Sequence, residues 1–279
     1  MMEAPPSMRV LAILATTALV SNAAASISYD IAPGRPRPDA PSGTLAFYGE
    51  VPDGAGYDYV VFAAGGGVIA PLDRLFSAGT FANDDFSREY AIESASGILD
   101  TIDIATGAVT AIGSTGLVDP RTSMRWDSHS GVTFAVEPMP DCTASSLYSV
   151  DLASGAATLI APLAGSCVKS MAIDPAGTIY LLDIATDALE RYDSDSGAVD
   201  LVGPLDFDVD DTTSMDFSGA SLYAVSGAGG SKGDNLYILD TTTGLSQIIG
   251  VIDVENPITA FATGVRRPDA IFADGFDAP

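Results

Sequence analysis

The sequence predicts an all-β fold, a five-bladed β-propeller of four-stranded antiparallel blades. The first observation is a repeated motif, hydrophobic–Asp–x–x–Thr/Ser–Gly–small–x–x–hydrophobic, with copies that begin at Leu99, Leu147, Leu189 and Leu236. The second is its period, because the aliphatic residues near the end of each copy recur at intervals of 43, 48, 42 and 47 residues: Ile69, Ile112, Ile160, Val202 and Ile249. The third is that the two ends of the repeat region are incomplete and complement each other.

Each copy is expected to form a β-hairpin. The apolar runs that flank the Asp-x-x-Thr/Ser-Gly segment are too short for helices and contain strand-forming residues. In the copy at residues 147–163, Asp151 begins the turn, where its carboxylate can accept backbone N–H groups, and Gly155 tolerates a positive φ. The hairpins are the third and fourth strands, C and D, of each blade.

A second repeated motif supplies the other two strands. Ser-Met-x-x-Asp/Ser occurs at residues 123–127, 170–174 and 214–218, with a weaker version at residues 80–84. A tight turn and another short strand follow each copy. One period therefore contains four strands, A to D, which is the content of one propeller blade.

The two ends of the repeat region are predicted to share one blade. Residues 43–51 match a B strand, and residues 258–263 match an A strand that no B strand follows. Together with the hairpin at residues 59–72 they complete the fifth blade, so that the last strand pairs with the first and closes the ring. The alternative is six blades, with an irregular blade in the N-terminal segment.

The repeated Leu-Tyr-x-hydrophobic-Asp-x-x-Thr/Ser-Gly blade resembles those of a large class of secreted bacterial β-propellers, over residues 43–263. The resemblance implies the architecture. It implies no particular activity, because such propellers include binding proteins, scaffolds and enzymes.

The N-terminal region predicts export. Residues 1–25 read as a secretory signal peptide, with Met8–Arg9 before an apolar run and Ala23-x-Ala25 as the cleavage site. Residues 26–42 form a proline-rich linker, residues 43–263 the propeller and residues 264–279 a C-terminal tail. We therefore expect a secreted, periplasmic or cell-surface protein with no transmembrane segment after cleavage.

Charge and composition narrow the possible partners. The net charge of −25 disfavours nucleic acid, whose phosphates such a surface would repel. One histidine, His129, and two cysteines exclude histidine-rich and cysteine-cluster metal sites. Cys142 and Cys167 are expected to form a disulfide, because they lie in a B–C loop and a D–A loop that emerge on the same face.

The same face is expected to carry the binding site, because its loops are long and irregular: residues 51–58, 114–122, 138–146, 205–213 and 226–235. Within it Asp206, Asp208, Asp210 and Asp211 place carboxylates as a calcium site would, although the glycine and distal glutamate of an EF-hand loop are missing. The other interpretation is a solvated acidic loop. No cofactor besides calcium is predicted.

Arg125 and Asp216 are the second candidate feature. They occupy the third position of the A-strand motif, where our alignment places Ala82, Ala172 and Ala260 in the other blades. With the neighbouring Trp126 they either contact a ligand at the channel or form a structural ion pair.

We predict a non-enzymatic propeller that binds a glycan, a protein or a small molecule. The alternatives are an extracellular hydrolase or lyase that uses loop carboxylates and a divalent cation, and a purely structural surface protein.

Overall fold

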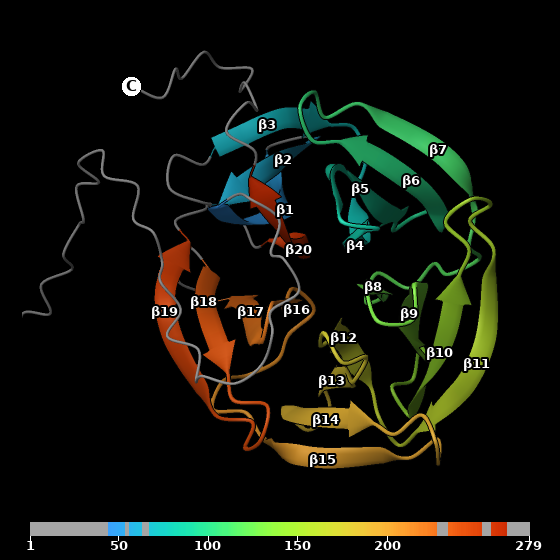
Figure 1. The fold of residues 1–279 in the computed structure, drawn as a ribbon, viewed down its shortest axis with the longest axis vertical. Coiled ribbons are helices and arrows are strands. Elements are labelled where there is room, and N and C mark those ends of the chain that lie inside the picture. The colour runs from blue at the N-terminus through green and yellow to red at the C-terminus, as the bar shows by residue number, and fades with distance from the viewer. Residues whose placement is uncertain (1–43, 54–55, 63–66, 228–233, 253–257, 267–279) are drawn as a thin grey trace, which may run out of the picture.

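The computed structural model describes residues 44–53, 56–62, 67–227, 234–252 and 258–266. It confirms the predicted fold: five four-stranded antiparallel sheets stand around a central axis (Figure 1). Among these residues there is no helix of the length and apolar character needed to cross a membrane. The predicted signal peptide, the linker and nearly all of the C-terminal tail lie outside the described residues.

The strands follow the chain blade by blade. Blade 1 contains β1 (Thr44–Asp53), β2 (Gly56–Phe62), β3 (Gly67–Leu72) and β20 (Thr259–Arg266). Blade 2 contains β4 (Phe76–Ala82), β5 (Asp85–Glu93), β6 (Ile98–Asp103) and β7 (Val109–Ser114). Blade 3 contains β8 (Ser123–Asp127), β9 (Val132–Pro138), β10 (Ala144–Val150) and β11 (Ala157–Ala164). Blade 4 contains β12 (Val168–Ile173), β13 (Ile179–Asp183), β14 (Ala188–Tyr192) and β15 (Val199–Pro204). Blade 5 contains β16 (Ser214–Ser218), β17 (Ser221–Gly227), β18 (Asp234–Leu239) and β19 (Ser246–Ile252).

The ring closes through blade 1, where the last strand pairs with the first. β20 runs antiparallel to β1, with Tyr48 opposite Ala262 and Glu50 opposite Thr259. Figure 1 shows β20 beside β1 at the inner edge of this blade. β20 continues to Arg266, three residues beyond the predicted end of the propeller at residue 263. Pairing with β20 supplies the inner strand of blade 1, without which β1 would be unpaired on that side.

The repeated turns have the predicted chemistry. In the turn between β6 and β7, the Asp103 carboxylate accepts the N–H groups of Ala105 at 3.0 Å and Thr106 at 2.9 Å. Gly107 follows with φ of 67°, and its N–H donates to the carbonyl oxygen of Asp103 at 2.7 Å. The recurrence of Asp and Gly among the copies of the motif is therefore explained by the turn itself.

Packing between blades supplies the core. Met124, Met171 and Met215 occupy equivalent positions of the inner strands and are fully buried. Met171 of blade 4 packs with Val136 and Leu147 of blade 3, and each blade thus buries apolar area against the blade before it.

Glycines in the outer strands allow close packing between neighbouring blades. A Cβ atom on Gly203 of β15 would lie 1.9 Å from the carbonyl oxygen of Thr243, in the turn between β18 and β19 of the next blade. A Cβ atom on Gly113 of β7 would likewise lie 2.1 Å from the Ser154 carbonyl oxygen of blade 3. Only glycine permits this approach of two backbones.

Replacing Gly203 by alanine is expected to destabilise the protein by about 1–3 kcal/mol, because the added methyl group must push two blades apart. Gly250 is the matched control, since it occupies the equivalent position of β19 and its Cβ atom would meet nothing within 4 Å. Gly250→Ala should change the free energy of unfolding in urea much less than Gly203→Ala does. Equal effects of the two substitutions would contradict the proposed contact.

Candidate binding site on the loop face

The D–A and B–C loops define one face of the ring, which we call the loop face. Its two longest described D–A connections are residues 115–122 and 205–213, whereas residues 73–75 and 165–167 make short ones. The predicted loop at residues 51–58 is mostly strand, because antiparallel pairing continues to Asp53 opposite Gly56. The two long loops therefore distinguish one part of this face from the rest.

Lys169 lies between these two long loops, at the start of β12. Val168 pairs with Asp183 and Ser170 pairs with Leu182, so that Lys169 is the extra residue of a β-bulge. A bulge changes the direction of the side chain that it carries. Lys169 is only 5% exposed and, of the cations whose side chains the structure describes, it alone has no carboxylate within 4.0 Å. The described residues accept no hydrogen bond from the Lys169 ammonium group.

The electrostatic environment of Lys169 is mixed. Burial lowers the pKa of its ammonium group to about 8, and Asp211 and Asp210 oppose this shift. Asp119, on the other long loop, also acts to keep the group charged. The charge is thus buried, close to acidic loops and without a direct partner.

Threonine side chains occupy the same level on the neighbouring inner strands. Thr122 and Thr213 directly precede Ser123 and Ser214, which are equivalent to Ser170 in the pairing register. The Thr122 hydroxyl is buried and has no hydrogen-bond partner among the described residues. The Thr213 hydroxyl is within 2.9 Å of the Ser226 hydroxyl. We call Thr122, Lys169 and Thr213, with Asp119, Asp210 and Asp211 of the two loops, the mouth site.

The loop that contains Asp119 is fixed to the cysteine pair. Arg121 forms an ion pair with Asp119 at 2.8 Å, and its Nη1 atom lies 3.1 Å from the Cys142 sulfur. Cys142 and Cys167 lie at disulfide distance, with their Cα atoms 4.9 Å apart. The predicted proximity of the two cysteines is therefore confirmed, and it holds loop 115–122 beside the start of β12.

The four aspartates predicted to bind calcium have separate hydrogen-bond partners. Asp206 accepts the backbone N–H and the hydroxyl of Ser246, and Asp210 accepts the Thr212 N–H at 2.8 Å. Over the described part of the chain, no three acidic, histidine or cysteine side chains are grouped to hold a metal ion. Calcium binding by Asp206, Asp208, Asp210 and Asp211 stays a prediction.

Arg125 fills the centre of the channel, deeper than the mouth site. Its guanidinium donates to the carbonyl oxygens of Gly79 at 2.6 Å, Met215 at 2.5 Å and Phe261 at 2.8 Å. It also forms the ion pair with Asp216, at 3.2 Å. These groups belong to blades 1, 2 and 5, so one side chain from blade 3 joins four of the five blades.

The register corrects our alignment of the inner strands. Thr80 faces Tyr90 as Arg125 faces Phe134, and Ala262 faces Tyr48, so Thr80 and Ala262 rather than Ala82 and Ala260 are equivalent to Arg125. Register shifts in β4 and opposite β20, which the motif did not reveal, displace the alignment.

Trp126 is directed away from the mouth site. Inner strands run from the loop face toward the A–B turns, and a Cβ atom on Gly131, in such a turn, would lie 3.7 Å from the indole ring. Of the three residues predicted as one ligand site, Arg125 and Asp216 are thus paired in the channel, whereas the Trp126 ring lies near an A–B turn.

Two buried carboxyl groups were missed at the interface of blades 1 and 2. Glu89 and Glu50 are each 1% exposed, and burial raises the pKa of each to about 8. The Tyr59 hydroxyl donates to Glu89, whose carboxyl occupies the space that a side chain on Gly79 would need. Glu50 accepts the Phe76 N–H at 2.7 Å. The sequence did contain a sign of these two groups: each is an acidic residue at a strand position that is apolar in other blades, such as Ile179 and Leu182 in blade 4.

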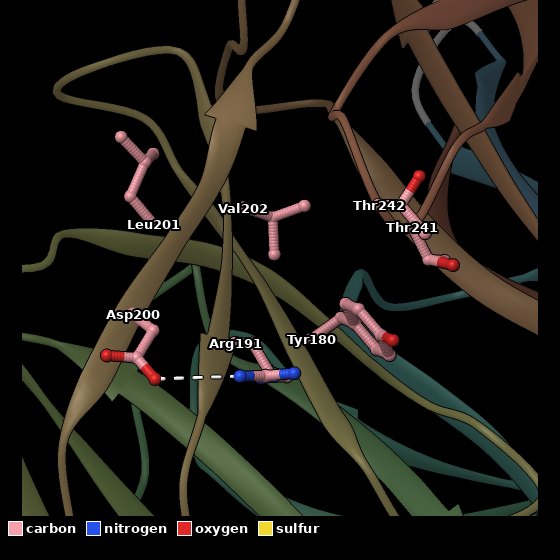
Figure 2. A pocket seen from close by; sticks show the side chains of 7 residues that line it. All are labelled: Tyr180, Arg191, Asp200, Leu201, Val202, Thr241 and Thr242. Carbon is pink, nitrogen blue, oxygen red and sulfur yellow. Dashed lines mark ion pairs between the residues drawn. The ribbon is translucent and has the colours of Figure 1, made fainter.

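A separate groove of about 370 Å³ lies between blades 4 and 5. Figure 2 shows Arg191 and Asp200 on one side, joined by an ion pair of 3.6 Å, and the two threonines of the blade 5 turn on the other. Its lining residues are Tyr180, Arg191, Asp200, Leu201, Val202, Thr241 and Thr242. Because the two charges neutralise each other and the Thr242 hydroxyl donates to Asp240, this groove offers few free polar groups.

Two solved structures with TM-scores above 0.5 agree with the fold. No family model matches the sequence, and no curated protein matches it. A protein of unknown function from Bacteroides thetaiotaomicron VPI-5482 is similar over 63% of this chain and 52% of its own, with a TM-score of 0.51 and 14% identity. The chain thus spans about half of that structure. A chain of a nidogen–laminin complex is similar over 80% of this chain and 99% of its own, with a TM-score of 0.52 and 9% identity. A calcium-binding protein, regucalcin, from Agrobacterium tumefaciens str. C58 has a TM-score of 0.46, 18% identity and 76% coverage of both chains.

Proposed function

We propose that this protein is a secreted, non-enzymatic propeller that binds a polar, hydroxyl-rich ligand such as a glycan at the mouth site. The observation that carries the proposal is Lys169, a buried cation without a direct partner between the two longest described D–A loops. The predicted signal peptide and the cysteine pair support an extracellular location.

The other charged side chains are less available to a ligand than Lys169. Arg74, Arg88, Arg121, Arg125 and Arg191 each form an ion pair, so their charges are already engaged. Glu50 and Glu89 are sealed between blades and out of reach of a ligand. A buried ammonium group without an acceptor is costly unless something binds it.

The ligand class follows from the groups at the mouth site. The Lys169 ammonium donates hydrogen bonds, whereas the carboxylates of Asp119, Asp210 and Asp211 accept them. A ligand must therefore offer acceptors and donors within a small area. Sugar hydroxyl groups do both, and they carry no charge that would be repelled by the acidic loops.

Lys169→Met tests this proposal in two measurements. We expect a rise in the free energy of unfolding of about 1–3 kcal/mol at pH 7, because the substitution removes a charge that burial disfavours. On an immobilised glycan array, the wild type should retain glycans that Lys169→Met binds at least tenfold more weakly.

Arg88→Met is the control for both measurements, since Arg88 is an exposed residue in a surface ion pair and should affect neither. A lower free energy of unfolding for Lys169→Met would assign Lys169 a structural role. Glycan retention that is absent, or equal in wild type and Lys169→Met, would refute the binding proposal.

A further inference from the structure

Among the described strands, the outer strand of each blade presents an open edge. In the hydrogen-bonding order of the five sheets, β3, β7, β11, β15 and β19 are each paired on one side only. An open edge can accept a strand from another chain, and proteins usually protect such edges with proline or charged residues.

Four of the five outer strands are poorly suited to pairing with a strand of another chain. β3, β11 and β15 contain Pro71, Pro162 and Pro204, which remove donors from the edge. β7 has no proline, but its exposed central residues, Thr110 and Ala111, are polar or small.

β19 is different from the other four strands. Its seven residues, Ser246–Ile252, include neither a proline nor a charge. Ile248, Ile249 and Val251 are 55%, 47% and 63% exposed. With Leu245 they make up four of the ten exposed large hydrophobic side chains found among the described residues. A long, uncharged, apolar edge is suited to pairing.

We infer that β19 is a docking edge to which an extended segment of a basic partner protein adds as a fifth strand of blade 5. The apolar side chains of β19 would contact alternate side chains of the added strand, while its backbone supplies hydrogen bonds. This surface is independent of the mouth site.

The charge around β19 selects a basic partner. Five exposed aspartates lie in residues 205–227 and 234–252: Asp206, Asp208, Asp210, Asp211 and Asp240. These two ranges contain no lysine or arginine. A second copy of this acidic chain would be repelled, whereas lysine or arginine residues beside the added strand would be attracted.

A synthetic nine-residue peptide of alternating valine and threonine, with a lysine at each end, is the probe. Fluorescence anisotropy should show that the full chain binds it, that Ile249→Lys weakens binding at least tenfold, and that raising the salt from 50 to 500 mM weakens it further. Thr110→Lys, which places the same charge on the edge of β7, is the matched control and should bind as the wild type does.

Three results would overturn the inference. The first is no binding by the wild type, and the second is equal binding of a peptide with proline at its centre, which cannot pair along the edge. The third is concentration-dependent self-association of the wild type that Ile249→Lys abolishes, because it would identify a second copy as the occupant. Lys169→Met should bind the peptide normally, so failure of the mouth-site proposal leaves this test intact.

Discussion

Arg125→Met should lower the free energy of unfolding by about 3–5 kcal/mol. The guanidinium is 2% exposed, and its loss would leave Asp216 buried without its cation. It would also leave the carbonyl oxygens of Gly79, Met215 and Phe261 without a donor at the axis. Urea denaturation at pH 7, with the transition followed by intrinsic fluorescence, measures the effect.

Arg88→Met separates the effect of position from that of charge. Arg88 belongs to an ion pair whose arginine side chain is 53% exposed, and its replacement should change stability by less than about 1 kcal/mol. If Arg125→Met unfolds within 1 kcal/mol of the wild type, Arg125 does not hold the blades together. The interpretation of Arg125 as a ligand contact would then be favoured.

The second large effect concerns pH. Glu50 and Glu89 have pKa values of about 8, against an ordinary value of 4.5. Between pH 4.5 and 8 the folded protein keeps these protons while the unfolded chain has released them. The folded state therefore binds more protons, and the free energy of unfolding falls as the pH rises through this interval. The contribution is fully present below pH 4.5 and is lost above pH 8.

The expected loss is at most about 3–5 kcal/mol for each carboxyl group. Burial also raises the pKa of Asp100, which acts in the same direction. Above pH 8, Lys169 acts in the opposite direction, since its lowered pKa lets the folded state release a proton before the unfolded chain does.

Glutamine variants isolate the two groups. Glu50→Gln and Glu89→Gln should each reduce the fall in unfolding free energy between pH 5 and pH 8, and the double variant should reduce it most. Asp195→Asn, at an exposed turn position, should leave the slope unchanged. A wild-type protein that is equally stable at pH 5 and pH 8 would show that neither glutamate is buried in the protonated form.

The blades could be predicted from the sequence because their turns depend on contacts between residues that are close along the chain. Asp103 and Gly107 form their turn through contacts within five residues, and the same turn recurs in each clear copy of the motif. Two incomplete ends, residues 43–51 and 258–263, required a shared blade, because an unpaired strand would leave an open edge. Five blades and closure through β1 and β20 followed from these features.

The candidate site was less accessible to the same reasoning. Lys169 was not singled out, because a lysine at the start of a strand is ordinary, and only the bulge and the two long loops bury it. Glu89 is placed by its contacts with Tyr59 and Gly79, which belong to other strands. The residues that flank Glu89 in the sequence do not predict these contacts.

The sequence by itself determined the strand count, the turns, the order of the blades and the closure of the ring, since each depends on contacts that are short along the chain or repeated in it. The tertiary structure decided which side chains meet at the axis and at the mouth site. Single-residue register shifts set the level of Thr80, Lys169 and Ala262, and a shift of one residue moves a side chain to the other side of its strand. Such shifts depend on packing between blades, which no single repeat encodes.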